Sequence, residues 1–150
     1  MKELYDKLKE QHSLPDFAVM DKEFEISGIE EENFLLRNIR KKISEKIEFS
    51  LKLLDDMLHP DVGFASYRES SIFMPEERDD IVNMIKKLMY FNRLSTELAL
   101  EDSDEGNAEF IKSFMKDWPD IRVHILGFVR KLKDSWQKDV SKKEVVGYLG

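Results

Sequence analysis

Three histidines and two groups of carboxylates are the side chains best suited to chemistry. His12, His59 and His124 lie far apart, and neither a His-x3-His nor a His-Glu-x2-His spacing occurs. Asp56 and His59 stand three residues apart, so a helix would place them on one face, as in bundles that bind two metals through two Glu-x-x-His motifs. The chain has one imperfect copy, and the dipole at a helix end also favours a histidine. We therefore predict no metal site.

The acidic run at 76–80 (EERDD) resembles half of the magnesium-binding pattern of helical nucleotide pyrophosphatases. Carboxylates are also common in the first turn of a helix, where the dipole favours negative charge. The sequence has no Gly-x-Ser-x-Gly elbow, no Gly-x-Gly phosphate loop and no cysteine. We expect no catalytic residue and no cofactor, with a metal-dependent hydrolase as the second alternative function.

The composition is that of a polar globular protein. The 150 residues are 41% hydrophobic and 37% charged, with a formal net charge of −7. Without cysteine, disulfides are excluded. The chain begins MKELYDKLKEQHSLPDF, which lacks the apolar core of a signal peptide, and no stretch approaches about 20 apolar residues. We therefore expect a cytoplasmic protein that does not associate with membranes.

Hydrophobic periodicity predicts helices along most of the chain. A short helix is expected over 2–12, followed by irregular extended chain over 16–28. One long helix is expected over about 29–58, with the acids of 30–32 in its first turn and His59-Pro60 at its end. Its apolar residues recur in steps of three or four, which is typical of a stripe on one helical face. They are Leu35, Leu36, Ile39, Ile43, Ile47, Leu51, Leu54 and Leu58.

The second half follows the same pattern. We expect a packed connection over 60–73, a helix over 75–100 that opens at Pro75, and an acid-rich break over 101–107. A short helix over 108–117 should stop at Trp118-Pro119, where a further helix begins. The tail at 140–150 either frays or docks. The prediction is a single all-α domain over 1–150: a bundle of four to five helices with no substantial sheet.

Charges and large apolar side chains mark the candidate interaction residues. The segments 37–46 and 122–143 are rich in Lys and Arg, so they could contact nucleic-acid phosphates or acidic protein surfaces, or simply be solvated. Aromatic groups in the connection and near the C-terminus are hard to bury in one small bundle, which favours a partner or a second copy. The candidate residues are Arg37, Arg40, Lys41, Phe64, Tyr67, Trp136 and Tyr148.

One region is similar to a known family. Residues 35–98 combine a helix with spaced bases, at Arg37, Arg40 and Lys46-Ile47, with a linker and a helix that opens Pro75-Glu76-Glu77. This arrangement resembles the helical domain of GINS replication subunits and covers under half of the chain. The resemblance implies a non-catalytic assembly factor that contacts a helicase and polymerases. GINS subunits usually add a small β domain, and nothing in this sequence matches one.

Taken together, the residues favour a non-catalytic helical protein that works by protein association, either with another protein or with copies of itself. Docking would use exposed apolar groups, with basic and acidic patches that fix the orientation. The first alternative is a nucleic-acid-associated factor that uses the basic helix faces of 37–46 and 122–143.

Overall fold

The structure is a computed structural model, described here for residues 1–59 and 62–137. Helices account for nearly all of this part of the chain, and it contains no strand, so the predicted all-α class is confirmed. In chain order the elements are α1 (Lys2–His12), α2 (Phe17–Phe24), the 3-10 turn η1 (Ile26–Gly28), α3 (Leu35–Leu58), α4 (Phe64–Ser70), α5 (Pro75–Glu101) and α6 (Asp104–Gln137).

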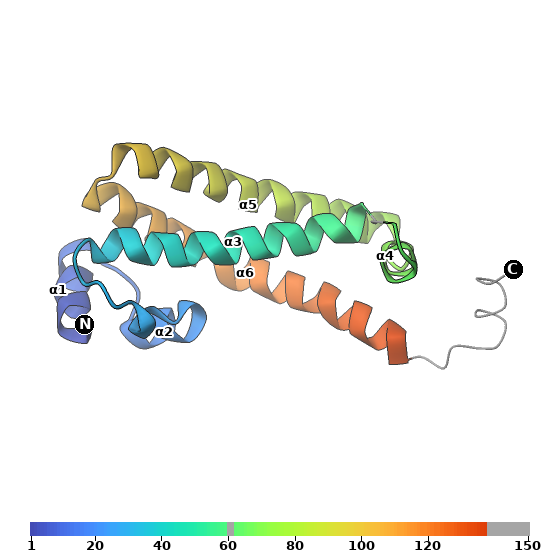
Figure 1. Cartoon of the computed structure of the whole chain (residues 1–150), viewed down its shortest axis with the longest axis horizontal. Helices are drawn as coiled ribbons and strands as arrows, with labels where there is room; N and C mark the ends of the chain where they lie inside the picture. The colour runs from blue at the N-terminus through green and yellow to red at the C-terminus, as the bar shows by residue number, and fades with distance from the viewer. Residues whose placement is uncertain (60–61, 138–150) are drawn as a thin grey trace, which may run out of the picture.

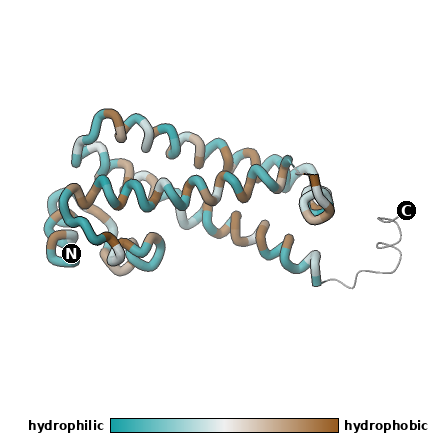
Figure 2. The backbone as a smooth tube through the Cα atoms, in the orientation of Figure 1, coloured by the Kyte–Doolittle hydropathy of each residue, from teal (hydrophilic) through white to brown (hydrophobic). Residues whose placement is uncertain are grey.

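Three long helices form the body of the molecule (Figure 1). Helices α3 and α6 run in the same direction and α5 runs back between their ends, while α1 and α2 lie at one end and α4 at the other. All three long helices contact one another, and α6 slants away from α3 toward its C-terminal end. Apolar positions recur on one side of each long helix (Figure 2), and these sides meet in a core that includes Ile43, Leu88 and Phe114.

The predicted N-terminal helix is confirmed, but the extended chain predicted over 16–28 is wrong. Helix α1 ends where Ser13 takes a left-handed conformation, just before Leu14 and Pro15. The next segment folds as α2 and η1. Val19 is exposed, and the two buried residues of α2 are Met20 and Phe24, which are spaced four apart as on a helix.

The long helix begins later than predicted. It starts at Leu35 because Phe34 has φ 57°, in the left-handed region that a helix cannot continue through. The acids of 30–32 therefore precede the helix and do not lie in its first turn. Its end at Leu58 agrees with the prediction.

Within the predicted connection over 60–73, residues 64–70 form the short helix α4. Helix α5 opens at Pro75 as predicted. The backbone N–H of Met74 donates to Oε1 of Glu77 over 3.0 Å, which satisfies one of the free N–H groups at the start of the helix.

Of the two breaks predicted near the C-terminus, the first is shorter than predicted and the second is absent. The acid-rich turn is reduced to Asp102 and Ser103, and α6 runs through Pro119. A proline inside a helix costs about 3 kcal/mol because it removes a hydrogen bond and crowds the preceding turn. Here Trp118 and Ile121 are buried on either side of it, and Trp118 stacks on Phe114 with ring centroids 5.3 Å apart. Core packing on both sides offsets the cost.

Candidate functional site

Arg37 is engaged within the chain. Its Nε donates to Oδ1 of Asp102 over 2.9 Å, and a second guanidinium nitrogen contacts the other carboxylate oxygen. Its guanidinium also lies 4.1 Å from the ring centroid of Phe34. The hydrogen bond with Arg37 lowers the pKa of Asp102 below its usual value. Arg37 thus joins the start of α3 to the turn before α6.

Arg40 is buried, so the expectation that it is a surface residue available for interactions is wrong. It is 4% exposed, with Nε donating to Oδ1 of Asn107 over 2.9 Å and Nη1 donating to the backbone oxygen and Oγ of Ser95. Burial lowers the pKa of Arg40, although an arginine stays protonated at neutral pH. Of the basic residues proposed at the start of α3, Lys41 remains exposed.

The predicted aromatic residues gather at the other end of the molecule. The rings of Phe64 and Trp136 meet edge to face with centroids 5.9 Å apart, and Nε1 of Trp136 donates to Glu69 over 3.0 Å. Tyr67 is exposed on the same short helix. These contacts tie α4 to the last turn of α6. Tyr148 and the predicted tail at 140–150 lie outside the described residues.

The histidines and carboxylates weighed for metal binding do not converge. Nε2 of His59 lies 3.9 Å from Asp55, both exposed, and Nδ1 of His124 lies 2.8 Å from the backbone oxygen of Asp120. Glu77 contacts Lys131 as well as capping α5, and these hydrogen bonds lower its pKa. Within residues 1–59 and 62–137, no three of these side chains are placed to hold a metal ion.

An apolar groove between α3 and α6 is the surface feature that the sequence analysis missed. It has a volume of about 330 Å³, and its apolar walls are Phe49 and Leu53 of α3 with Leu126 and Val129 of α6, of which all but Phe49 are half-buried. Phe49 is 68% exposed. Figure 1 shows that α6 slants away from α3 toward its C-terminal end. We name this surface feature the α3–α6 groove.

Both walls repeat the same order of residues. On α3, Lys46 is followed by Phe49 and Leu53, and on α6 Arg122 is followed by Leu126 and Val129. The two helices run in the same direction, so both bases lie at the end of the groove nearest α2. No acidic residue is among the side chains that line it. The groove is therefore lined by bases at one end, where Glu23 of α2 lies 3.6 Å from Arg122, and by apolar side chains along its length.

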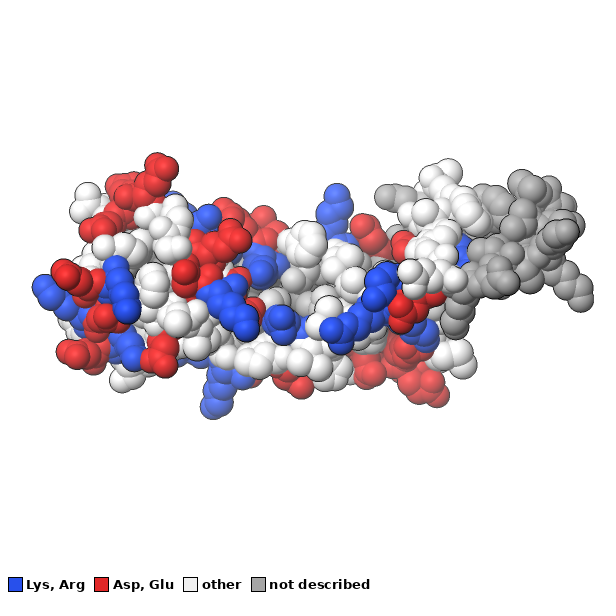
Figure 3. All heavy atoms as spheres, turned by 90° about the horizontal axis from the view of Figure 1, so that it is seen from below, with Lys and Arg blue, Asp and Glu red and all other residues white. Residues whose placement is uncertain are grey.

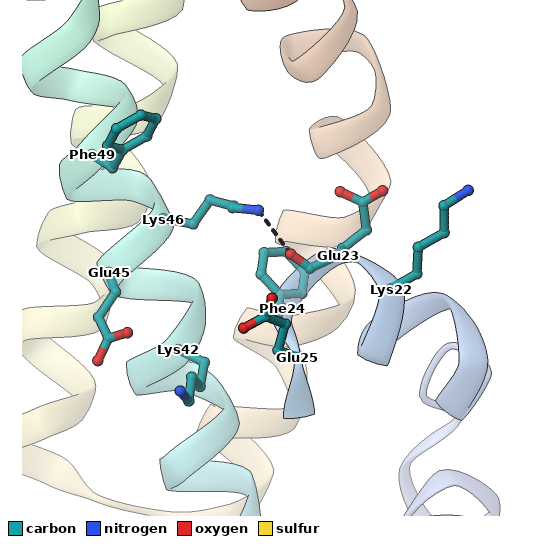
Figure 4. Close-up of a pocket in the computed structure, with 8 residues that line it drawn as sticks. All are labelled: Lys22, Glu23, Phe24, Glu25, Lys42, Glu45, Lys46 and Phe49. Atoms are coloured by element: carbon teal, nitrogen blue, oxygen red, sulfur yellow. Dashed lines mark hydrogen bonds between the residues drawn. The ribbon is translucent and has the colours of Figure 1, made fainter. Parts of the chain in front are cut away.

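A polar hollow continues the groove at its basic end. This hollow, of about 310 Å³, shares Lys46 and Phe49 with the groove and is also lined by residues of α2. Figure 4 shows Lys46 reaching from α3 toward α2, where its Nζ donates to the backbone oxygen of Glu23 over 2.9 Å. Lys22 points away from this contact. Seen from below, basic side chains gather over the middle of the molecule and acidic ones lie mostly around them (Figure 3).

Helix α2 lies against α6 at the basic end of the groove. Phe24 packs on the rings of Phe114 and Trp118, with centroid distances of 6.0 and 6.2 Å. Glu23 accepts a hydrogen bond from Nε1 of Trp118 over 2.9 Å and lies 3.6 Å from Nε of Arg122. The chain thus already binds one short helix here through an aromatic ring and an adjacent carboxylate.

Comparison with known proteins does not place the chain in a family. No family model, curated protein or solved structure matches it. The resemblance of residues 35–98 to GINS subunits therefore stays a prediction. Among the helices described, none is long and apolar enough to cross a bilayer.

A spacing signal for the groove was present in the sequence. Phe49 and Leu53 repeat at four residues beside the main apolar stripe of α3, and Leu126 precedes Val129 at three residues on α6. Each pair makes the apolar face of its helix wider than the strip that a single neighbouring helix can cover. The slant of α6 could not be predicted from the sequence. Because of this slant, the two widened apolar faces are not fully covered by each other.

Proposed function

We propose that the protein is a non-catalytic association module, and that the α3–α6 groove binds an amphipathic helix of a protein partner. The observation that carries this proposal is the pair of matched walls, each a base followed by two apolar residues that line the groove, with Phe49 exposed and the other three half-buried. An apolar groove that takes the apolar face of a helix is a recurring mode of protein recognition.

The length of the groove supports a helical occupant. On α6 the lining runs from Trp118 to Val129, and at 1.5 Å per residue this span is about 16 Å, or about three helical turns. Three turns present apolar residues at i, i+4 and i+7, which suffices to cover Leu126, Val129 and the α3 wall. Burial of Phe49, the most exposed of these side chains, would remove a large apolar area from water.

The charge of the groove supports an acidic occupant. Lys46 and Arg122 both line one end of the groove, and Arg122 already lies 3.6 Å from Glu23, so it is chiefly the ammonium of Lys46 that would attract carboxylates at one end of the partner helix. Helix α2 supplies the precedent, because Glu23 lies beside Arg122 and Trp118. The chain's own residues 138–150 have three lysines against two acids, which is the wrong charge for this end.

The test is a binding titration with a labelled helical peptide of about 14 residues that has leucines at i, i+4 and i+7 and glutamates in one end turn. We expect fluorescence anisotropy to report saturable binding, and the same peptide with lysines for glutamates to bind at least tenfold more weakly. Leu126→Glu should weaken binding at least tenfold. Val123→Glu, an exposed apolar position elsewhere on α6, is the matched control and should leave it unchanged.

Two results would overturn the proposal: equal binding of both peptides, or equal effects of Leu126→Glu and Val123→Glu. Self-association through the same groove would instead appear as a dimer in sedimentation velocity that Leu126→Glu dissociates, and it would contradict a separate partner. The assay uses the full chain, since both variants change residues outside the core.

Nucleic acid is the alternative proposal. Exposed Lys41 supports it, whereas Arg37 and Arg40 are engaged inside the chain and weaken it. Binding through several phosphates would fall steeply with salt. Binding of a DNA or RNA oligonucleotide that weakens by orders of magnitude between low and moderate salt, and that Lys41→Glu abolishes, would favour this alternative.

A further inference from the structure

A second groove, between α3 and α5, has a buried charge at its base. It has a volume of about 430 Å³ and is lined by polar side chains, among them Ser44, Asn92 and Thr96. Arg40 also lines it. We name it the α3–α5 groove. Its chemistry is unlike that of the α3–α6 groove, because its lining supplies hydroxyl, amide and guanidinium groups.

The buried guanidinium of Arg40 has neutral partners only. Its acceptors are the amide oxygen of Asn107 and the backbone and hydroxyl oxygens of Ser95, at 2.8 to 3.0 Å. Buried charges in proteins are normally paired with an opposite charge, because removing an ion from water costs several kcal/mol. Asp102 attracts Arg40 electrostatically, but its carboxylate is bound by Arg37. Two guanidinium groups therefore share one carboxylate.

One nitrogen of Arg40 makes no hydrogen bond to the described residues. The described hydrogen bonds of Arg40 use Nε and Nη1, and Nη2 donates to no described group. Arg40 is 4% exposed and lines the groove, so the groove is the route by which a ligand would reach its charge.

We propose that the α3–α5 groove binds a small organic carboxylate on Nη2 of Arg40. The ligand would supply a hydrogen-bonded carboxylate to a guanidinium that now shares Asp102 with Arg37, and N–H donors of arginine suit a carboxylate well. Lys41 and the side-chain amide of Asn92 lie on the walls of the groove. Glu45 and Glu48 also line it and repel anions, and this repulsion is stronger for an anion with more than one charge than for a monocarboxylate.

The test is an NMR titration of the full chain that follows the side-chain Nε–H signals of its arginines. Sodium acetate is the probe, with sodium chloride at matched ionic strength as the reference. We expect acetate to shift the Arg40 signal saturably, and chloride to leave it unchanged. The Arg37 signal is an internal control, because its guanidinium is already bound by Asp102.

Replacing Arg40 would also destabilise the fold, so a variant that blocks the groove is the better test of the proposal. Ala99 is exposed and lines the groove, so Ala99→Phe should weaken acetate binding at least tenfold while leaving the hydrogen bonds of Arg40 in place. Ala18→Phe, at an exposed position of α2, is the matched control and should bind acetate normally.

Three results would overturn the proposal. The first is an equal response to acetate and chloride. The second is an equal effect of Ala99→Phe and Ala18→Phe. The third is a stronger response to inorganic phosphate than to acetate, which would contradict the carboxylate assignment. None of these results bears on the α3–α6 groove, so this inference and the proposed function fail independently.

Discussion

The two grooves beside α3 differ in the kind of side chain that they expose and in what those side chains do for folding. Toward α6 the exposed residues are apolar, as with Phe49, and they border a space that no described residue fills. Toward α5 the lining is polar, and Ser44 and Ser95 hydrogen-bond each other across the interface at 2.6 Å. The comparison suggests that the first groove is free to bind a partner, whereas the second also holds three helices together.

The largest expected effect is a loss of stability, which should be large for a core residue beside the α3–α6 groove and small for a residue of the groove wall. Leu54 is fully buried, so Leu54→Ala should lower the free energy of unfolding by about 2–5 kcal/mol. Phe49→Ser, five residues earlier on the groove wall, should change it by less than about 0.5 kcal/mol. Urea denaturation followed by circular dichroism measures both. A loss above about 2 kcal/mol for Phe49→Ser would show that the groove residues serve the fold.

The second effect concerns the α3–α5 groove. Arg40→Ala leaves the oxygens of Asn107 and Ser95 without their donor, which costs about 1–3 kcal/mol for a buried acceptor. We therefore expect urea denaturation to show a loss of about 2–4 kcal/mol. Lys41→Ala changes the neighbouring exposed base and is the matched control, with an expected change below about 0.5 kcal/mol. Equal effects at the two positions would mean that Arg40 does not join the helices.

The smallest effect depends on pH and tests the carboxylate beside Arg37. The pKa of Asp102 is lowered in the folded state, so its contribution to stability is present above the ordinary carboxyl pKa of about 3.9 and is lost as the pH falls through the folded pKa. Asp102→Asn should therefore lower the urea midpoint at pH 7 and have less effect at pH 3. Glu97→Gln, an exposed change on α5, is the control. A decrease of the same size at both pH values would contradict this account.

Strong periodicity made most of the helices predictable. The core faces of α3 and α5 recur every three or four residues over long stretches, and the start of α5 at Pro75 follows from the fixed φ of proline. The prediction failed where tertiary packing outweighed local preference. Pro119 was expected to end a helix, but the buried residues on both sides of it keep α6 continuous.

The candidate sites were harder to predict than the fold. Arg40 and Lys41 are adjacent bases in the sequence, yet one is buried and the other exposed, because α5 and α6 pack on one side of α3 only. The α3–α6 groove depends on the slant between two helices that are 45 or more residues apart, which no local pattern encodes. Pairing across such distances is a property of the assembled bundle.

The most direct test of the central claim is to map where the acidic helical peptide binds, by following the backbone amide signals of the full chain in an NMR titration. The account predicts that the shifts concentrate at Phe49, Leu53, Leu126 and Val129, with little change at Asn92 and Thr96 across α3. Shifts that concentrate in the α3–α5 groove, or no saturable shift at millimolar peptide, would contradict it.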